Sequence, residues 1–125
     1  MEVLVIIIIC LVILFLPMII GLIFMGAQRS VRVIHSQSGI TKEGYVGYCW
    51  TYYLFGFLVP LFRGEIGIAL MHCVFTVISF GLFQIIMPFL YNKQYMTRML
   101  TAGWELYDSP EVNDWARMKL SIANR

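Results

Sequence analysis

The stretch "FLVPLFRGEIGIAL", Phe57 to Leu70, places a proline, an arginine, a glycine and a glutamate between two long apolar runs. Pro60 ends or kinks a helix, and Gly64 permits a tight reversal of the chain. The charges of Arg63 and Glu65 are costly in the centre of a bilayer, so they mark a turn at the water interface. The stretch therefore predicts a tight helical hairpin, because so short a connection joins antiparallel neighbours. For Arg63 we expect plain anchoring at the interface, and binding of a lipid phosphate is the alternative.

The composition around this turn is typical of a membrane protein. Hydrophobic residues make up 60% of the 125-residue chain and charged residues 13%, and the mean hydropathy is +0.80. A soluble helical bundle of this length, the alternative class, could not bury so much apolar surface in one small core. Three apolar runs reach or approach the ~18 residues of a membrane span: Val3 to Ala27, Tyr45 to Phe62, and Ile66 to Tyr91.

The first apolar run is predicted to be an uncleaved anchor. It begins with Glu2 instead of a lysine or arginine, and it is about twice as long as the core of a signal peptide. Met25, two positions before Ala27, makes a poor cleavage site. A cleaved signal peptide is the alternative.

Basic residues predict the orientation, since lysine and arginine collect near the cytoplasmic ends of spans. The residues that determine it lie between the first two runs and after the third: Arg29, Arg32, Lys42, Lys93 and Arg98. Three spans place both segments in the cytoplasm and the N-terminus outside.

The expected fold is an all-α integral membrane protein with three transmembrane helices and a short C-terminal amphipathic helix. Residues 1–35 are expected to form the anchor helix, 36–44 a cytoplasmic loop, 45–95 the hairpin with its turn near 60–65, and 96–125 a cytoplasmic or interfacial tail. In the tail, Asp108 as N-cap, followed by Pro110 and Glu111, predicts a helix over 109–123.

One helical face of the third run carries polar residues. His72, Thr76 and Ser79 recur at intervals of four and three residues, with Gln84 to one side. We expect a neutral His72 that is hydrogen-bonded to Tyr52 or to a backbone carbonyl. A proton relay or ligand site, the alternative, would need further carboxylates or histidines, and the runs supply none.

The sequence favours no enzyme, cofactor, metal or nucleic acid. It contains no nucleophile with its base, no paired carboxylates and no phosphate-binding loop. Cys10, Cys49 and Cys73 lack metal-type spacing. The net charge of +2, without a lysine- or arginine-rich run, does not indicate nucleic-acid binding.

Residues 50 to 106 resemble the HrgC-like family, small bacterial inner-membrane proteins of unknown function. The resemblance rests on "VPLFRG" at Val59 to Gly64, on Pro88 to Lys93 with Tyr95, and on the pair Gly103-Trp104. It covers under half of the chain, and it implies a hairpin topology and a bacterial origin without any catalytic residue.

Together these features predict a non-enzymatic, multi-pass protein of the bacterial inner membrane that acts through protein–protein contacts in the bilayer. An accessory subunit or a defence or immunity-type protein would fit. Its expected partners are the lipid bilayer and either another membrane protein or further copies of itself. The alternative is a small homo-oligomeric transporter or pore, with its path lined by His72, Thr76, Ser79 and Gln84.

Overall fold

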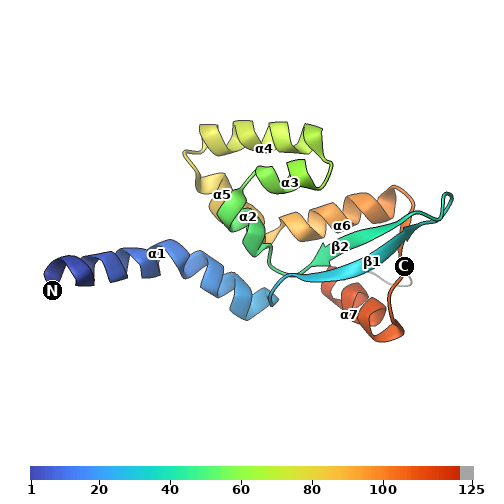
Figure 1. Cartoon of the computed structure of the whole chain (residues 1–125), viewed down its shortest axis with the longest axis horizontal. Helices are drawn as coiled ribbons and strands as arrows, with labels where there is room; N and C mark the ends of the chain where they lie inside the picture. The colour runs from blue at the N-terminus through green and yellow to red at the C-terminus, as the bar shows by residue number, and fades with distance from the viewer. Residues whose placement is uncertain (122–125) are drawn as a thin grey trace.

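One long helix leads into an antiparallel sheet instead of a second span (Figure 1). The structure is a computed structural model that describes residues 1–121. Helix α1 (Glu2–Met25) is followed by the hairpin of β1 (Arg29–His35) and β2 (Thr41–Val46). Strand β3 (Trp104–Leu106) pairs with the other edge of β1, so the strand order is β2-β1-β3 and both pairings are antiparallel.

Short helices make up the segment between β2 and β3. They are α2 (Trp50–Phe55), α3 (Leu58–Phe62), α4 (Ile66–Ile78), α5 (Leu82–Ile86), the 3₁₀ turn η1 (Met87–Phe89) and α6 (Tyr91–Thr101). After β3 comes α7 (Pro110–Leu120). In the view of Figure 1 the sheet runs between α6 and α7. We call the sheet with these two helices the polar module.

The sheet forms because β1 alternates between buried and exposed side chains. Val31 and Val33 are fully buried, and Arg32 between them is exposed, which is the period of a half-buried strand. Gly44 lies opposite Val31 in the register. A Cβ on this glycine would overlap the sulfur of Met96, so its small size lets α6 pack closely on β2. The core of the module therefore joins the strands to α6.

The prediction of an all-α integral membrane protein with three transmembrane helices is wrong. Among residues 1–121, only α1 is by itself long and apolar enough to cross a membrane. The run 45–62 is not one helix, because Tyr45 and Val46 pair with β1 and Gly56, at φ 60°, separates α2 from α3. The multi-pass class is therefore not supported.

The prediction that residues 45–95 form a hairpin of two transmembrane helices is also wrong. The segment from Ile66 to Phe89 bends by 118° at the break between α4 and α5, so it does not run straight through a bilayer. Residues 29–35, expected to extend the first helix, form β1. Their valines alternate with polar residues, and that alternation favours a strand over a helix.

The tail begins its helix one residue later than expected. Ser109 is the N-cap, and its hydroxyl accepts a hydrogen bond of 3.3 Å from the backbone N–H of Val112. The Asp108 carboxylate instead accepts from the backbone N–H of Arg32 on β1 and of Ser109. Helix α7 ends at Leu120, and residues 122 and 123 of the predicted helix lie outside the described residues.

Two elements present apolar side chains on their outer surfaces. The first is α1, in which no residue of the most apolar 18-residue stretch is buried. The second is residues 66–86, which comprise α4, the turn after it and α5 and contain no Asp, Glu, Lys or Arg. We call this segment the apolar arm. Its exposed side chains are Ile66, Leu70, Met71, Val74, Phe75, Val77, Ile78, Phe80, Leu82, Ile85 and Ile86.

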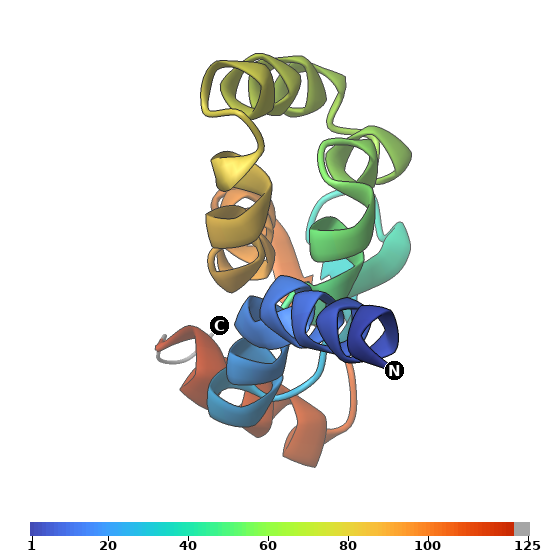
Figure 2. The ribbon, with the colours of Figure 1, turned by 90° about the vertical axis from the view of Figure 1, so that its left-hand side faces the viewer.

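Both elements project from the same side of the molecule. Figure 1 shows α1 and the turn between α4 and α5 on the side away from the sheet. Figure 2 looks onto that side, with α4 across the top and α1 below it. Phe80, at the α4–α5 turn, has 98% of its surface exposed. Between α1 and residue 121, the charged residues lie in the polar module or in its loops, apart from Arg63 and Glu65.

Candidate functional site

Arg63 is the centre of a polar cluster where the apolar arm meets the polar module. The turn between α3 and α4 reverses at Gly64, whose φ is 84°. The Arg63 guanidinium donates one hydrogen bond of 2.8 Å to Oδ1 of Asn92 on α6 and another of 3.0 Å to Oε1 of Gln28. Gln28 lies between α1 and β1. The turn is thus attached to two elements far from it in sequence.

Three tyrosine rings surround the same guanidinium. Its Cζ lies 4.1 Å from the ring centre of Tyr45, 4.9 Å from that of Tyr95 and 5.1 Å from that of Tyr91. The latter two are four residues apart on α6 and share one face. Cation–π attraction at these distances stabilises the charge of the guanidinium.

Glu65 makes its ion pair with Arg98, not with Arg63. The Arg98 guanidinium donates two hydrogen bonds to the carboxylate, of 2.7 and 2.9 Å, and the Tyr91 hydroxyl donates a third of 2.7 Å. Burial acts to raise the pKa of Glu65, but the hydrogen bonds from Arg98 and Tyr91 and the charges of Arg98 and Arg63 lower it below its ordinary value. Glu65 is therefore ionised at neutral pH.

This pairing leaves one positive charge at the turn. Arg63, Arg98 and Glu65 sum to +1 (two arginines minus one glutamate), and the part of the chain that the structure describes gives Arg63 no ion pair. A half-buried cation is therefore held in place by neutral oxygens and aromatic rings.

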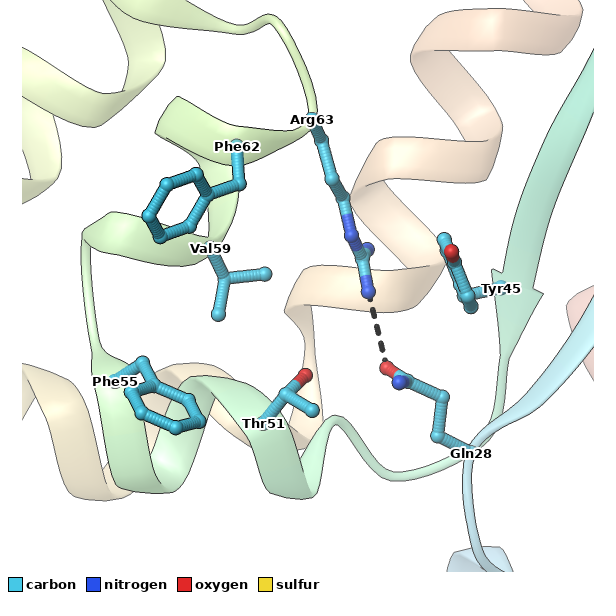
Figure 3. A pocket seen from close by; sticks show the side chains of 7 residues that line it. All are labelled: Gln28, Tyr45, Thr51, Phe55, Val59, Phe62 and Arg63. Carbon is cyan, nitrogen blue, oxygen red and sulfur yellow. Dashed lines mark hydrogen bonds between the residues drawn. The ribbon is translucent and has the colours of Figure 1, made fainter.

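A pocket of about 350 Å³ opens beside Arg63 (Figure 3). Figure 3 shows Arg63 reaching toward Gln28 at one end, with the rings of Phe55 and Phe62 on the other side of the space. The lining residues are Gln28, Tyr45, Thr51, Phe55, Val59, Phe62 and Arg63. The pocket is amphipathic, since one wall is polar and cationic and the other is apolar.

His72 has the partner that the sequence suggested. Its Nδ1 lies 2.9 Å from the Tyr52 hydroxyl, so the hydrogen bond predicted between them is confirmed. The imidazole is buried, with the rings of Phe83 and Tyr91 at 4.9 and 5.9 Å. His72 thus joins α4 to α2 inside the molecule.

The other three members of the predicted polar face each donate a hydrogen bond to a backbone carbonyl. Thr76 Oγ1 donates to the carbonyl of His72, and Ser79 Oγ donates to the carbonyl of Thr76. Gln84 Nε2 donates to the carbonyl of Tyr53 on α2, at 2.9 Å. Gln84 therefore joins α5 to α2, while Thr76 and Ser79 donate to carbonyls of α4 itself.

The residues expected to determine topology all lie in the polar module. Arg29 stacks over Trp115 of α7 at 5.0 Å, and Lys42 stacks over Trp104 at 4.5 Å. Arg32 is on β1, and Lys93 and Arg98 are on α6. Pro60, expected at the turn, is buried within α3, and its carbonyl accepts from the backbone N–H of Glu65.

Sequence reasoning missed the partners of Arg63. Asn92 is 1% exposed, and its amide donates to Gln28 Oε1 at 2.9 Å and to the carbonyl of Gly47 at 3.2 Å. The available signal was the pair Tyr91 and Tyr95, which lie at helical spacing in "YNKQY". Within residues 1–121, no three histidine, cysteine or acidic side chains gather as a metal site requires.

Comparisons with protein-family models, curated proteins and solved structures found no match to this chain. The resemblance to the HrgC-like family therefore stays a prediction.

Proposed function

We propose that this chain is a membrane-anchored, non-enzymatic protein that holds the polar module at the cytoplasmic face of the bacterial inner membrane. It acts through contacts that α1 and the apolar arm make inside the bilayer. The observation that carries the proposal is the separation of charge from exposed apolar surface in the folded chain.

Helix α1 has the dimensions of a single anchor. Its 24 residues span about 36 Å at ~1.5 Å per residue, and a hydrocarbon core is ~30 Å thick. A helix that is apolar on all sides and unburied requires lipid or another apolar partner. Arg29 and Arg32 follow the helix directly and favour the cytoplasm for the polar module. The N-terminus then lies on the opposite side.

The apolar arm is proposed to enter one leaflet and return. The 13 residues of α4 cover about 20 Å, less than the full core, and the bend of 118° after them turns the chain back. The exposed Phe80 would lie deepest. Arg63 and Glu65, at the other end of α4, would stay at the interface beside α6. The arm thus adds a second membrane contact without a second span.

The pore alternative has no specific observation in its favour. Thr76, Ser79 and Gln84 donate hydrogen bonds within the protomer. Fewer of their donors are therefore left to bind water or ions along a path between protomers. Contacts of the apolar surfaces with lipid, with another membrane protein or with further copies need no such path.

Spin labelling tests the proposed depth of the arm in the full chain. Cys10 and Cys73 are changed to alanine, and the buried Cys49 is kept. A nitroxide is then placed at Phe80 in the arm, at Ile13 in α1 or at Gln37 in the exposed β1–β2 loop. In liposomes we expect the labels at Phe80 and Ile13 to collide with oxygen and not with a water-soluble nickel chelate, and Gln37 to show the reverse.

The two parts of the proposal fail separately in this experiment. Nickel access at Phe80 with protection at Ile13 would leave an anchored protein whose arm lies in water. Nickel access at both positions would refute membrane anchoring altogether.

A further inference from the structure

We propose that the Arg63 pocket binds the phosphate group of an anionic phospholipid, with the start of its acyl chains against Phe55, Val59 and Phe62. The inference rests on the proposed function, because it needs the apolar arm to lie in a leaflet. It adds a defined lipid site to what would otherwise be nonspecific contact.

The first argument is that Arg63 is already placed for an anion. Its guanidinium carries five N–H donors. One nitrogen donates to Asn92, and another donates to Gln28 and lies 3.9 Å from Cys49 Sγ, so two N–H groups keep no partner among the described residues. The three tyrosine ring centres lie 4.1 to 5.1 Å from its Cζ. A guanidinium held in one orientation donates its remaining N–H groups to a phosphate with little further loss of conformational entropy.

The second argument is charge. Glu65 forms its ion pair with Arg98 and accepts from Tyr91, so the cluster of Arg63, Arg98 and Glu65 keeps a net charge of +1. The positive charge at the pocket is half-buried and next to apolar surface, where screening by water is weak. An anion is the ligand that such a site favours, and a zwitterionic lipid would bring its own cation.

The third argument is the shape of the pocket and its position. About 350 Å³ is within the usual range for small-ligand sites, and it exceeds what a phosphate group alone would fill. Phe62 is 81% exposed and Phe55 is 55% exposed, so the apolar wall continues onto the outer surface. The polar end of the pocket is next to α6, where Arg63 donates to Asn92, and the apolar wall is formed by α2 and α3. A phospholipid has the same order of polar head and apolar chain.

A purely structural Arg63 is the competing explanation. In that case the residue only ties the turn to Asn92 and Gln28, and the lipid composition does not matter to it. The two explanations differ in whether an anionic lipid is retained selectively.

The experiment measures lipids retained by the full chain. The protein is reconstituted in nanodiscs with equal amounts of phosphatidylglycerol and phosphatidylcholine, released into detergent, and analysed by native mass spectrometry. We expect wild type to retain phosphatidylglycerol in preference to phosphatidylcholine, and Arg63→Gln to reduce that preference by about tenfold or more, as loss of a charge-assisted bond implies. Lys93→Gln, which removes the same charge from an exposed position on α6, should leave the preference unchanged.

A second variant guards against misfolding of Arg63→Gln. Phe62→Ser alters an exposed side chain of the apolar wall, and it should weaken retention of phosphatidylglycerol while the far-ultraviolet circular dichroism stays unchanged. Millimolar inorganic phosphate should not displace the lipid. Displacement by phosphate would overturn the lipid assignment in favour of a free-anion site, and equal retention by wild type and both pocket variants would overturn the site.

The spin label at Phe80, measured in the same nanodiscs, separates this inference from the proposed function. If wild type does not retain phosphatidylglycerol selectively while Phe80 stays shielded from the nickel chelate, only the lipid site is refuted. Exposure of Phe80 to the chelate refutes both.

Discussion

The ion pair between Glu65 and Arg98 offers a quantitative test of how the apolar arm is attached to the polar module. We expect Glu65→Gln and Arg98→Gln each to lower the free energy of unfolding by about 2 kcal/mol. Exposed pairs contribute ~0.2–1 kcal/mol, and removal of one member of a fully buried pair costs ~3–5 kcal/mol. The side chains of Glu65 and Arg98 are 17% and 34% exposed, so this pair lies between the two cases.

The coupling between the two residues is the sharper quantity. Two hydrogen bonds of 2.7 and 2.9 Å join them, and a coupling energy of about 1.5 kcal/mol is expected in a double-mutant cycle. The assay is urea unfolding of the full chain in detergent micelles, followed by tryptophan fluorescence. The comparison is the i,i+3 pair Arg117 and Asp114 on α7, which has a hydrogen bond of 2.8 Å and an Asp114 side chain that is 76% exposed. Its coupling should stay below about 0.5 kcal/mol. A similarly small value for Glu65 and Arg98 would refute the view that this contact fastens the arm.

Three further outcomes follow from the same geometry. The pKa of Glu65 in the folded protein is below its ordinary value of 4.5. Its contribution to stability is therefore complete above that value and is lost as the pH falls through the folded pKa. Lowering the pH from about 5 to about 3 should reduce the free energy of unfolding, measured with urea, more for wild type than for Glu65→Gln. Gly44→Ala should cost about 1–3 kcal/mol in thermal or urea unfolding, since its Cβ would meet the sulfur of Met96, and a loss under about 0.5 kcal/mol would contradict the close packing of α6 on β2. A cysteine at Gly64 should react with an impermeant maleimide from the same side of the membrane as one at Gln37, because the turn packs on α6; labelling from opposite sides would contradict that packing.

Local features were predictable, and tertiary partners were not. The long apolar helix at the N-terminus and the reversal at Gly64 both follow from local composition, and both are present. The partners of Arg63 and Glu65 come from residues about 30 positions away, and no local pattern identifies Asn92 or Arg98 among many polar residues.

The error over residues 45–62 has a specific physical origin. Hydrophobicity summed along a window does not distinguish a straight span from a strand followed by two short helices. Tyr45 and Val46 are as apolar as a span requires, but they pair with β1, and the positive φ of Gly56 ends α2. "RSVRVIH" carried a period-2 signal that was interpreted as the end of a helix. For the polar face that includes His72, the hydrogen bond between His72 and Tyr52 is the part of the prediction that the structure confirms.

Gln28 connects the anchor and the turn mechanically. Its side-chain oxygen accepts from both Arg63 and Asn92, and it lies three residues after the end of α1. A helix about 36 Å long tilts when the bilayer around it becomes thinner. In the proposed membrane orientation, the end of α1 next to the polar module would pull on Gln28. The turn would then move with α1, or the two hydrogen bonds that Gln28 accepts would break. A change in bilayer thickness would then strain the hydrogen bonds of the Arg63 guanidinium before it disturbed the sheet.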